Sequence, residues 1–594
     1  MVSANVGPRR SLPLPARQPI GRWLRESSTG LVALAITIGA GAGLGAIAFR
    51  WLIGSFTQLF SGHADYSDAG GDAHPWLPAL GPWFVLIAPV LAGLVYGPLV
   101  ARFAPEARGH GVPEVMYAVA ERGGRIPAQV TVVKAIASAM CIGSGGSVGR
   151  EGPIVQIGSA LGSTLGRLTR LPESRLRVLV ACGAAGGIAA TFNAPLAGPF
   201  FAMELILRDF AMESFGAVVL SSVAASVVGR AVLGSAAFLN LPPFTLRSPV
   251  EYLLFVALGV VVGVVGVLFT RVLYWIEDAC DWAWRGPEWL RPAAGGLLLG
   301  VVLLVLPQMY GVGYPVLENA VEGKYVFWFL LVLLIGKMIA TSLTIGIGGS
   351  GGVFAPSLFL GAMAGTAFGI LVHAWLPGMT ASPGVYGLIG MGAAFAGAAR
   401  APITAVIVLF ELTGQYTIIL PMLTAIVIAT LTSKALSRDT IYTLKLRRRG
   451  IDLDKPKGSP RLDGTRVGTV LEPLPEPLDE HTTLDDAARS LARSDHGILP
   501  VTGADGRYHG CVTARAVAES LDDEQTATRT IADLAELPPL VTTGSTLSAA
   551  LSALVADQGN GLPVLDPGTH ALVGWITHQT ILTTLQPATT AKVD

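Results

Sequence analysis

The chain has 594 residues, of which 51% are hydrophobic and only 14% carry a charged side chain. Soluble domains contain about 25% charged residues, so this composition excludes an ordinary soluble globular protein. Lysine plus arginine balance aspartate plus glutamate at 41 each, and this zero net charge gives no reason to expect a nucleic-acid partner. The four cysteines are scattered, so neither a disulfide framework nor a metal-ligand cluster is predicted.

The first 27 residues are a Pro- and Arg-rich leader without the cleavage pattern of a signal peptide. Apolar runs then predict helices in close succession, at about 30–60, 78–103, 112–121, 128–142, 153–170, 175–191, 194–208, 214–232, 250–280, 287–307, 325–345, 356–376, 385–399, 403–414 and 418–437. Several runs are shorter than the roughly 20 residues that cross a bilayer, and broken helices are tolerated only where their ends are buried or line a cavity. We therefore expect an α-helical polytopic membrane protein with roughly 17–18 helices, partial helices included.

Charge at the two ends of the apolar region predicts the topology. Five arginines precede the first run, and Lys445 with residues 447–449 follows the last one. Basic residues favour the cytoplasmic side, so both termini are expected there, in a multi-pass protein of the cell membrane. The polar, acidic segment 61–77 suits an outside loop.

One glycine-rich segment occurs twice. Residues 134–153 read KAIASAMCIGSGGSVGREGP and residues 337–356 read KMIATSLTIGIGGSGGVFAP, with half of the positions identical. A second pair follows, because Glu204 comes nine residues after Pro195 and Glu411 nine residues after Pro402. Apolar repeats broken by glycine and proline are typical of transporters with a site at the repeat interface. The repeats are expected at about 78–232 and 287–437.

The breaks in these repeats predict an anion site. Glycines precede Pro153, Pro356 and Pro113, and proline fits the first turn of a helix. A helix N-terminus carries partial positive charge and unpaired N–H groups, so three converging N-termini would bind an anion. The candidate anion-binding residues are His110, Gly111, Val112, Gly149, Arg150, Gly152, Val353, Phe354 and Ala355. Glu151 places a titratable carboxylate at this site, where it would compete with the anion when ionised.

GREGP, GVFAP, the GHGVP loop and the Ala-Pro segments resemble those of the CLC family of chloride channels and chloride/proton antiporters, across about residues 30–450. The resemblance implies a transmembrane domain at 28–450, a homodimer with one anion pathway per subunit, and chloride as the transported ion. It also implies Glu151 as the gating glutamate, Phe354 at the central site, and Tyr442 as the phenol that binds the central anion. No cofactor is expected, and no nucleophile–base pair indicates an enzyme.

Two departures from the family pattern affect the expected function. His110 stands where the family commonly has serine, so it either donates an N–H to the anion or points away from it. Leu205 stands where antiporters of the family carry a carboxylate that receives protons, and leucine cannot relay a proton. Leu205 therefore favours a gated chloride channel, with Glu204 as an alternative proton carrier in a proton-coupled antiporter. A membrane sensor that transports nothing is a minor alternative.

After a linker at 451–465, residues 466–590 read as a soluble α/β tail with two βαββα units, at about 466–522 and 530–588. The units resemble a tandem CBS (Bateman) pair. Pairs that bind adenine nucleotides usually carry an aspartate three residues after the threonine that opens the last helix. Here Thr513 and Thr577 are followed at that position by Ala516 and Thr580, so the sequence leaves nucleotide binding open.

Overall fold

The computed structural model describes most of the chain, in the ranges 20–67, 71–234, 247–453, 464–494, 496–504, 507–521, 530–557, 561–569 and 571–585, together with Leu462. Two compact units divide the chain, Met1–Leu453 and Asp454–Asp594. Residues 1–19 of the expected leader and 454–461 of the expected linker lie outside the described residues.

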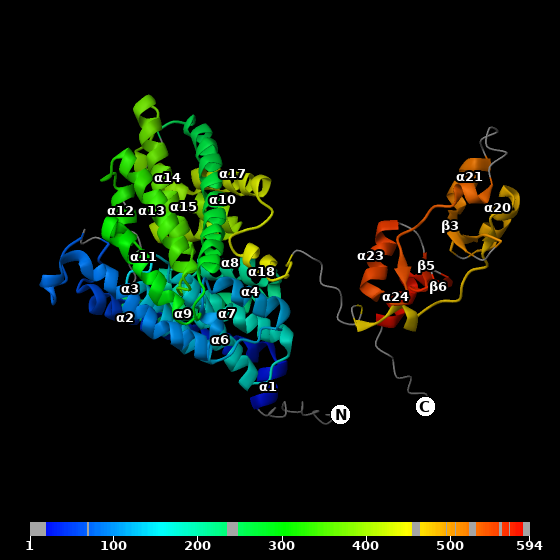
Figure 1. Ribbon diagram of the computed structural model, residues 1–594, viewed down its shortest axis with the longest axis horizontal. Helices are drawn as coiled ribbons and strands as arrows, with labels where there is room; N and C mark the ends of the chain where they lie inside the picture. The colour runs from blue at the N-terminus through cyan, green and yellow to red at the C-terminus, as the bar shows by residue number, and fades with distance from the viewer. Residues whose placement is uncertain are drawn as a thin grey trace, which may run out of the picture. The chain divides into compact units, whose positions relative to one another are not determined.

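The first unit contains the same series of helices twice (Figure 1). The first series consists of α2 (Ser28–Ser61), α3 (Phe84–Phe103), α4 (Val112–Glu121), α5 (Gln129–Gly143), α6 (Glu151–Leu168), α7 (Glu173–Phe192), α8 (Ala197–Phe201) with its π-helical continuation (Ala202–Leu207), and α9 (Met212–Leu233). The second consists of α10 (Glu251–Ala283), α11 (Arg291–Val305), α12 (Tyr314–Val321), α13 (Phe327–Gly346), α14 (Phe354–Trp375), α15 (Pro383–Ala399), α16 (Pro402–Thr413) and α17 (Ile419–Leu436). The short α1 (Ile20–Glu26) precedes both series, and α18 (Thr443–Arg448) follows them.

Corresponding helices of the two series pack in corresponding pairs. Helix α6 lies against α7 as α14 lies against α15, and α2 lies against α9 as α10 lies against α17. Glycines allow the close approach: a Cβ atom at Gly158 would lie 2.1 Å from the Gly183 carbonyl oxygen, and one at Gly361 would lie 2.2 Å from that of Gly390. Small residues bring helices together in membranes by this means. Each series also includes a long first helix, α2 or α10, that lies outside the repeat boundaries expected from the sequence.

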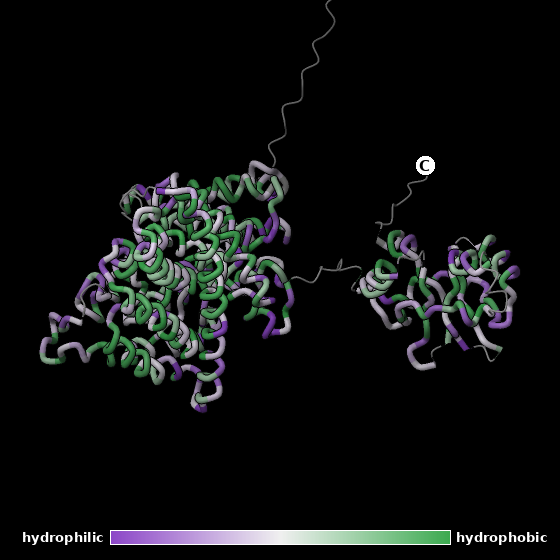
Figure 2. The backbone as a smooth tube through the Cα atoms, turned by 90° about the horizontal axis from the view of Figure 1, so that it is seen from above, coloured by the Kyte–Doolittle hydropathy of each residue, from purple (hydrophilic) through white to green (hydrophobic). Residues whose placement is uncertain are grey.

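Much of the backbone of the first unit is hydrophobic, with hydrophilic segments mainly at its edges (Figure 2). Among the described residues, eight helices are long and apolar enough to cross a membrane, from Ser28–Ser61 to Ile419–Leu436. The prediction of a polytopic helical membrane protein with short, broken helices between the long ones is confirmed. Two short helices, α12 and α18, were not among the apolar runs predicted from the sequence.

The two helices after the doubled segment begin earlier than expected. Helix α6 begins at Glu151 and α14 at Phe354, so Pro153 and Pro356 each occupy the third helical position. Proline is accommodated there because the first N–H groups of a helix have no partner within the helix. As a result, Glu151 and Phe354 occupy equivalent positions at the first residue of their helices.

The second unit repeats one βαββα arrangement, as predicted. The first copy is β1 (Leu478–Asp479), α20 (Leu484–Arg493), β2 (Ile498–Thr502), β3 (Tyr508–Thr513) and α21 (Ala514–Leu521). The second copy, preceded by α22 (Ile531–Leu534), is β4 (Val541–Thr542), α23 (Leu547–Asp557), β5 (Gly561–Leu565), β6 (Leu572–Thr577) and α24 (His578–Leu585). In each three-stranded sheet the first pair of strands is parallel and the second antiparallel.

The two copies share a buried cluster. Ile498, Cys511 and Trp575 pack together, and the Glu472 backbone exchanges hydrogen bonds of 2.9 and 3.1 Å with Trp575. Burial raises the pKa of the Cys511 thiol from its ordinary value to about 11, although the Tyr508 hydroxyl lies only 3.3 Å from its sulfur. The tail is therefore held together by contacts that join its halves.

Candidate functional site

The three glycine-rich loops meet at one junction. Gly149 and Gly352 exchange backbone hydrogen bonds, with N–H to oxygen distances of 2.7 and 2.6 Å. Gly109 donates its N–H to the Gly349 carbonyl at 3.0 Å and accepts one from Gly351 at 3.3 Å. These contacts bring together the N-termini of α4, α6 and α14, which lie far apart in the sequence. The described backbone thus has the convergence that the doubled segment predicts.

Two buried lysines fix the loops from behind. Lys134 on α5 donates hydrogen bonds of 2.8 Å to the carbonyl oxygens of Ala107 and Gly109. Lys337, its counterpart on α13, donates bonds of 3.0 Å to those of Gly311 and Val312. Both lysines are fully buried, and all four of these bonds are made to backbone carbonyl oxygens. The matched lysines of the doubled segment are therefore supports for two equivalent loops.

The second of these loops was not predicted from the sequence. Residues 311–315 read GVGYP, which repeats the GHGVP of residues 109–113 in the other half. The loop leads into α12 and places Tyr314 at its first residue, where α4 has Val112. The signal that could have found it is the Gly-x-Gly-x-Pro pattern, which precedes each matched lysine by similar distances.

Glu151 lies inside the junction with only 1% of its surface exposed. One carboxylate oxygen accepts a hydrogen bond of 2.7 Å from the Tyr314 hydroxyl. The other lies 3.4 Å from the backbone N–H of Ala355, in the first turn of α14. The carboxylate of one repeat therefore occupies the helix N-terminus of the other, where an anion would bind.

The second-repeat residues of the predicted site are also buried. Phe354 is 2% exposed, and Val353 and Ala355 on either side of it are equally enclosed. The Phe354 ring centroid lies 4.5 Å from that of Phe395 and 5.4 Å from that of Phe192. The Phe354 side chain thus packs among aromatic rings, and the residue itself opens the first turn of α14.

Close packing explains why glycine occupies the junction. A Cβ atom at Gly152 would lie 2.0 Å from the His110 carbonyl oxygen and 3.0 Å from the Gly352 Cα. Gly111 has a φ of +83°, in the left-handed region that favours glycine. At Gly149, a Cβ atom would lie 2.1 Å from the Glu151 carboxylate.

His110 is 1% exposed, and neither of its ring nitrogens has a hydrogen-bond partner among the described residues. Its ring centroid lies 6.1 Å from that of Tyr274 on α10. A buried imidazole without a partner is unusual, because burying an unpaired polar group is unfavourable. An acceptor that is not part of the protein would satisfy its N–H.

Tyr442 precedes α18 and is 1% exposed. Its neighbour Ile441 donates its N–H to the Ala398 carbonyl at 2.9 Å and accepts a hydrogen bond of 2.7 Å from the Tyr274 hydroxyl. The backbone next to Tyr442 is thus anchored to both α15 and α10.

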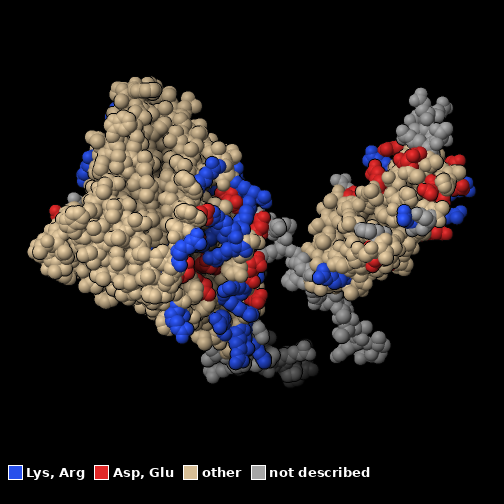
Figure 3. Space-filling view, viewed as in Figure 1, with Lys and Arg blue, Asp and Glu red and all other residues tan. Residues whose placement is uncertain are grey.

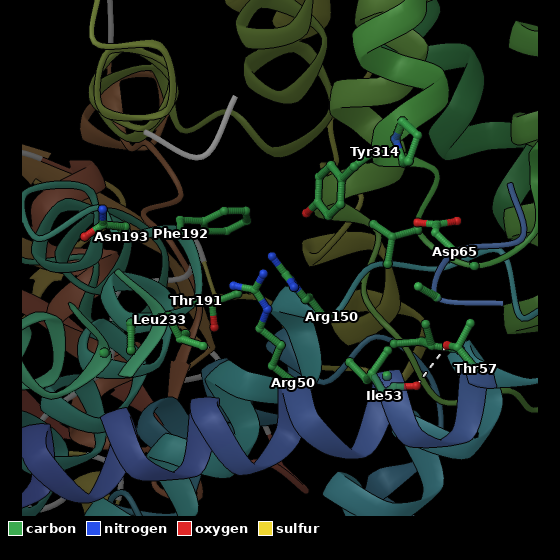
Figure 4. A pocket seen from close by; sticks show the side chains of 18 of the residues that line it. Arg50, Ile53, Thr57, Asp65, Arg150, Thr191, Phe192, Asn193, Leu233 and Tyr314 are labelled. Carbon is green, nitrogen blue, oxygen red and sulfur yellow. Dashed lines mark hydrogen bonds between the residues drawn. The ribbon is translucent and has the colours of Figure 1, made fainter. Parts of the chain in front are cut away.

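A cavity of about 520 Å³ lies on one side of the junction (Figure 4). Arg50 of α2 and Arg150 point into it beside Tyr314, and Asp65 lines its far side. The Arg150 guanidinium lies 5.4 Å from the centre of the Tyr314 ring. A cavity with several arginines attracts anions by raising their local concentration. Arg150 therefore belongs to the approach to Glu151, rather than to the backbone junction itself.

A second cavity of about 360 Å³ lies near His110. It is lined by Tyr274 and by charged residues of both signs, namely Arg108, Glu277, Asp281, Glu288, Arg291, Lys445, Arg448 and Arg449. Lysine and arginine gather on this side of the first unit, in the region of α18, α4 and α1 (Figure 3). The first cavity is lined by Arg150 and Tyr314 beside Glu151, and the second by Tyr274, whose ring centroid lies 6.1 Å from that of His110.

Glu204 and Glu411 make reciprocal contacts between the repeats. Glu204 accepts hydrogen bonds of 3.2 and 2.8 Å from the backbone N–H groups at the start of α16, and one of 2.7 Å from the Thr404 hydroxyl. Glu411 accepts bonds of 2.9 and 2.7 Å from the Leu196 and Ala197 N–H groups at the start of α8. Each matched glutamate thus caps the helix that follows the Ala-Pro pair of the other repeat. Leu205 beside Glu204 is 5% exposed.

The two tail threonines act as helix caps. The Thr513 hydroxyl accepts the Ala516 N–H at 3.2 Å, and the Thr577 hydroxyl accepts the Thr580 N–H at 3.1 Å. Thr577 also donates a hydrogen bond of 2.7 Å to Glu472. Both threonine hydroxyls therefore cap the helices that follow them.

Comparisons with known proteins agree with this geometry. The family described as voltage gated chloride channel matches residues 92–434, and the CBS domain family matches residues 470–523. A putative chloride channel protein ClcB-like from Ralstonia nicotianae is 33% identical over 422 residues, which cover 70% of this chain and 97% of that protein.

Two further relatives are named as exchangers. The H(+)/Cl(-) exchange transporter ClcA of Vibrio parahaemolyticus is 36% identical over 388 residues, covering 64% of this chain and 82% of that protein. The solved structure of a slow cyanobacterial Cl−/H+ antiporter superposes with a TM-score of 0.62 at 26% identity, covering 70% of this chain and 97% of that one.

Proposed function

The chain belongs to the CLC family of anion transporters, and we propose that it exchanges chloride for protons across the membrane. The observation that carries the proposal is the Glu151 carboxylate, held between the Tyr314 hydroxyl and the Ala355 N–H at the junction of three helix N-termini. A titratable group in the place of the anion can couple the two ions, because proton and anion alternate at one site. The names of the Vibrio and cyanobacterial relatives support exchange over passive conduction.

In this proposal the anion is bound mainly by backbone groups. The first turns of α4, α6 and α14 supply N–H donors and the positive ends of helix dipoles. Tyr442 is proposed to add a hydroxyl donor to the anion. Binding by dipoles, without a full positive charge in contact, is weak enough to let the anion leave again.

Glu151 then acts as the gate. When ionised, its carboxylate occupies the N-terminus of α14 and excludes chloride from that place. Protonated, it is neutral, no longer attracted by the N-terminus of α14, and free to leave. Each proton that it accepts opens the position for an anion, and each anion that leaves allows the carboxylate to return.

Leu205 affects the route by which protons would reach Glu151 from the side of the protein opposite the gate. Leucine cannot accept a proton, and Glu204 is held by three hydrogen bonds at the start of α16, where its charge stabilises that helix. We infer that protons reach Glu151 through water, without a fixed carboxylate between. The second candidate function, a gated chloride channel, is favoured by Leu205 and by the name of the Ralstonia relative.

His110 is proposed to contribute to anion binding. Its ring nitrogens have no partner among the described residues, and Lys134 and Lys445 lie close by, so an anion would supply the missing acceptor. The variant His110→Ser is expected to change the ratio of chloride to nitrate flux. Identical ratios would place the imidazole outside the binding site.

Orientation and assembly follow from the same family membership. We propose that the basic side of the first unit, which carries α1 and α18, faces the cytoplasm of a cell membrane, by the excess of arginine and lysine there. A homodimer is proposed through α8, α9, α16 and α17, which expose apolar side chains such as Val227 and Leu420. The tail is proposed to support the protein without binding nucleotide, because Ala516 and Thr580 stand where nucleotide-binding pairs usually carry an aspartate.

Exchange is tested in proteoliposomes with a chloride gradient and no initial pH gradient. Outward chloride movement should drive protons into the vesicles and so build up a pH gradient. A pH-sensitive dye inside the vesicles reports the acidification. Glu151→Gln should retain chloride flux and abolish proton movement, because glutamine does not titrate. Chloride flux in the unmodified protein without any proton movement would reject exchange in favour of the channel.

A further inference from the structure

The hydroxyl of Tyr314 makes the shortest contact of the Glu151 carboxylate, at 2.7 Å. The other contact, from the Ala355 N–H, is 3.4 Å long. The two residues belong to different repeats and are 163 positions apart in the chain. Tyr314 is the repeat counterpart of Val112, so this hydroxyl has no equivalent on the other side of the junction.

The position of the hydroxyl is fixed by the loop before it. Gly313 has a φ of +84°, and Lys337 holds the carbonyls of Gly311 and Val312. The Arg150 guanidinium lies over the Tyr314 ring, 5.4 Å from its centre. A buried lysine, a left-handed glycine and a cation over the ring thus aim one phenol at one carboxylate oxygen (Figure 4 shows the Tyr314 and Arg150 side chains).

We propose that Tyr314 is a latch, a positioning residue whose hydroxyl holds the ionised Glu151 across the anion pathway. The inference rests on the proposed role of Glu151 as the gate. A hydrogen bond to an ionised acceptor is roughly twice as strong as one to a neutral group. The latch therefore holds the charged gate firmly and weakens when Glu151 takes a proton. Once Glu151 leaves, the released hydroxyl is a donor for the anion that enters.

Charged and titratable groups from several elements face Glu151 and its cavity. Charged or titratable side chains around it and its cavity are Arg50 on α2, Asp65 after α2, Arg150 just before α6, Arg230 on α9, Tyr310 before α12, Tyr314 and Glu318 on α12, Lys337 on α13 and Tyr442 before α18. The cations favour the ionised carboxylate and the acidic groups oppose it, whereas the Tyr314 hydroxyl donates a hydrogen bond of 2.7 Å directly to its oxygen. Removing the hydroxyl leaves every charge in place, so its effect can be measured separately.

The test is the dependence of chloride flux on external pH in proteoliposomes that contain the full chain. Tyr314→Phe keeps the ring under Arg150 and removes only the donor. Because the ionised gate loses a partner, Glu151 should take its proton at higher pH, so the midpoint of activation should shift upward. At a pH above the midpoint, flux should rise about tenfold, as expected for one hydrogen bond to a charged group.

The matched control is Tyr310→Phe, which removes a hydroxyl that donates to the Gly143 carbonyl at 2.7 Å. Its midpoint should stay in place. An equal shift in both variants, or no shift in Tyr314→Phe, would overturn the latch. Incorporation of 3,5-difluorotyrosine at position 314 strengthens the donor at nearly constant shape and should move the midpoint downward; an upward move would also overturn the latch.

Glu151→Gln separates the latch from the gate. If that variant loses its pH dependence and Tyr314→Phe added to it has no further effect, both the gate and the latch are supported. If Glu151→Gln keeps the full pH dependence, the gate itself is rejected. If Glu151→Gln loses the dependence while Tyr314→Phe alone leaves the midpoint unchanged, only the latch is rejected.

Discussion

The reciprocal glutamates allow the proton route to be tested by stability as well as by transport. Glu204→Gln and Glu411→Gln each remove a charge that caps a helix of the other repeat and retain one acceptor oxygen. A hydrogen bond to a charged group contributes about 1.5–3 kcal/mol, and a charge at a helix N-terminus about 0.3–1 kcal/mol. Since one acceptor remains, we expect each variant to lose about 2 kcal/mol of unfolding free energy.

The assay is unfolding of the purified full chain in mixed micelles with increasing dodecyl sulfate, followed by proton-coupled flux of the same samples. The two variants should be destabilised to a similar extent and should retain proton movement. Glu411 is the matched control, because it occupies the equivalent position in the other repeat. A Glu204→Gln protein that keeps its stability and loses proton movement, beside an active Glu411→Gln protein, would refute the cap and identify Glu204 as a relay.

Gly152→Ala should abolish transport, because the added Cβ would lie 2.0 Å from the His110 carbonyl oxygen, whereas Gly41→Ala on α2, with no atom within 4 Å, should not change flux. Folding raises the pKa of the Cys511 thiol from 9.0 to about 11, so the neutral thiol's contribution to stability is present below pH 9 and lost as the pH rises through 11. The difference in unfolding free energy between the unmodified protein and Cys511→Ala should therefore shrink by about 2–3 kcal/mol between these pH values. Calorimetry with ATP or AMP should give no heat of binding, because the Thr577 hydroxyl already donates to the protein; saturable binding that Thr577→Val removes would contradict this.

Much of the architecture could be predicted from short motifs because glycine and proline fix local backbone. GREGP and GVFAP marked two helix starts and their convergence, and the Thr-led helices of the tail followed from alternating strands and turns. The exact starts shifted to Glu151 and Phe354, since proline is tolerated anywhere in the first turn.

Contacts between the repeats could not be predicted in the same way. The bond from Tyr314 to Glu151 depends on two loops that approach only after the halves pack. The matched spacing from proline to Glu204 and Glu411 was visible, but its meaning as reciprocal caps required the position of each opposite helix. The GVGYP loop was within reach of the sequence, through its likeness to GHGVP.

Chloride and protons are proposed to alternate at the Glu151 carboxylate, and a current measurement tests this most directly. With equal chloride on both sides of a planar bilayer and a pH gradient across it, the account predicts a reversal potential displaced from zero, and a return to zero in Glu151→Gln. A reversal potential of zero in the unmodified protein, together with full chloride current, would contradict it.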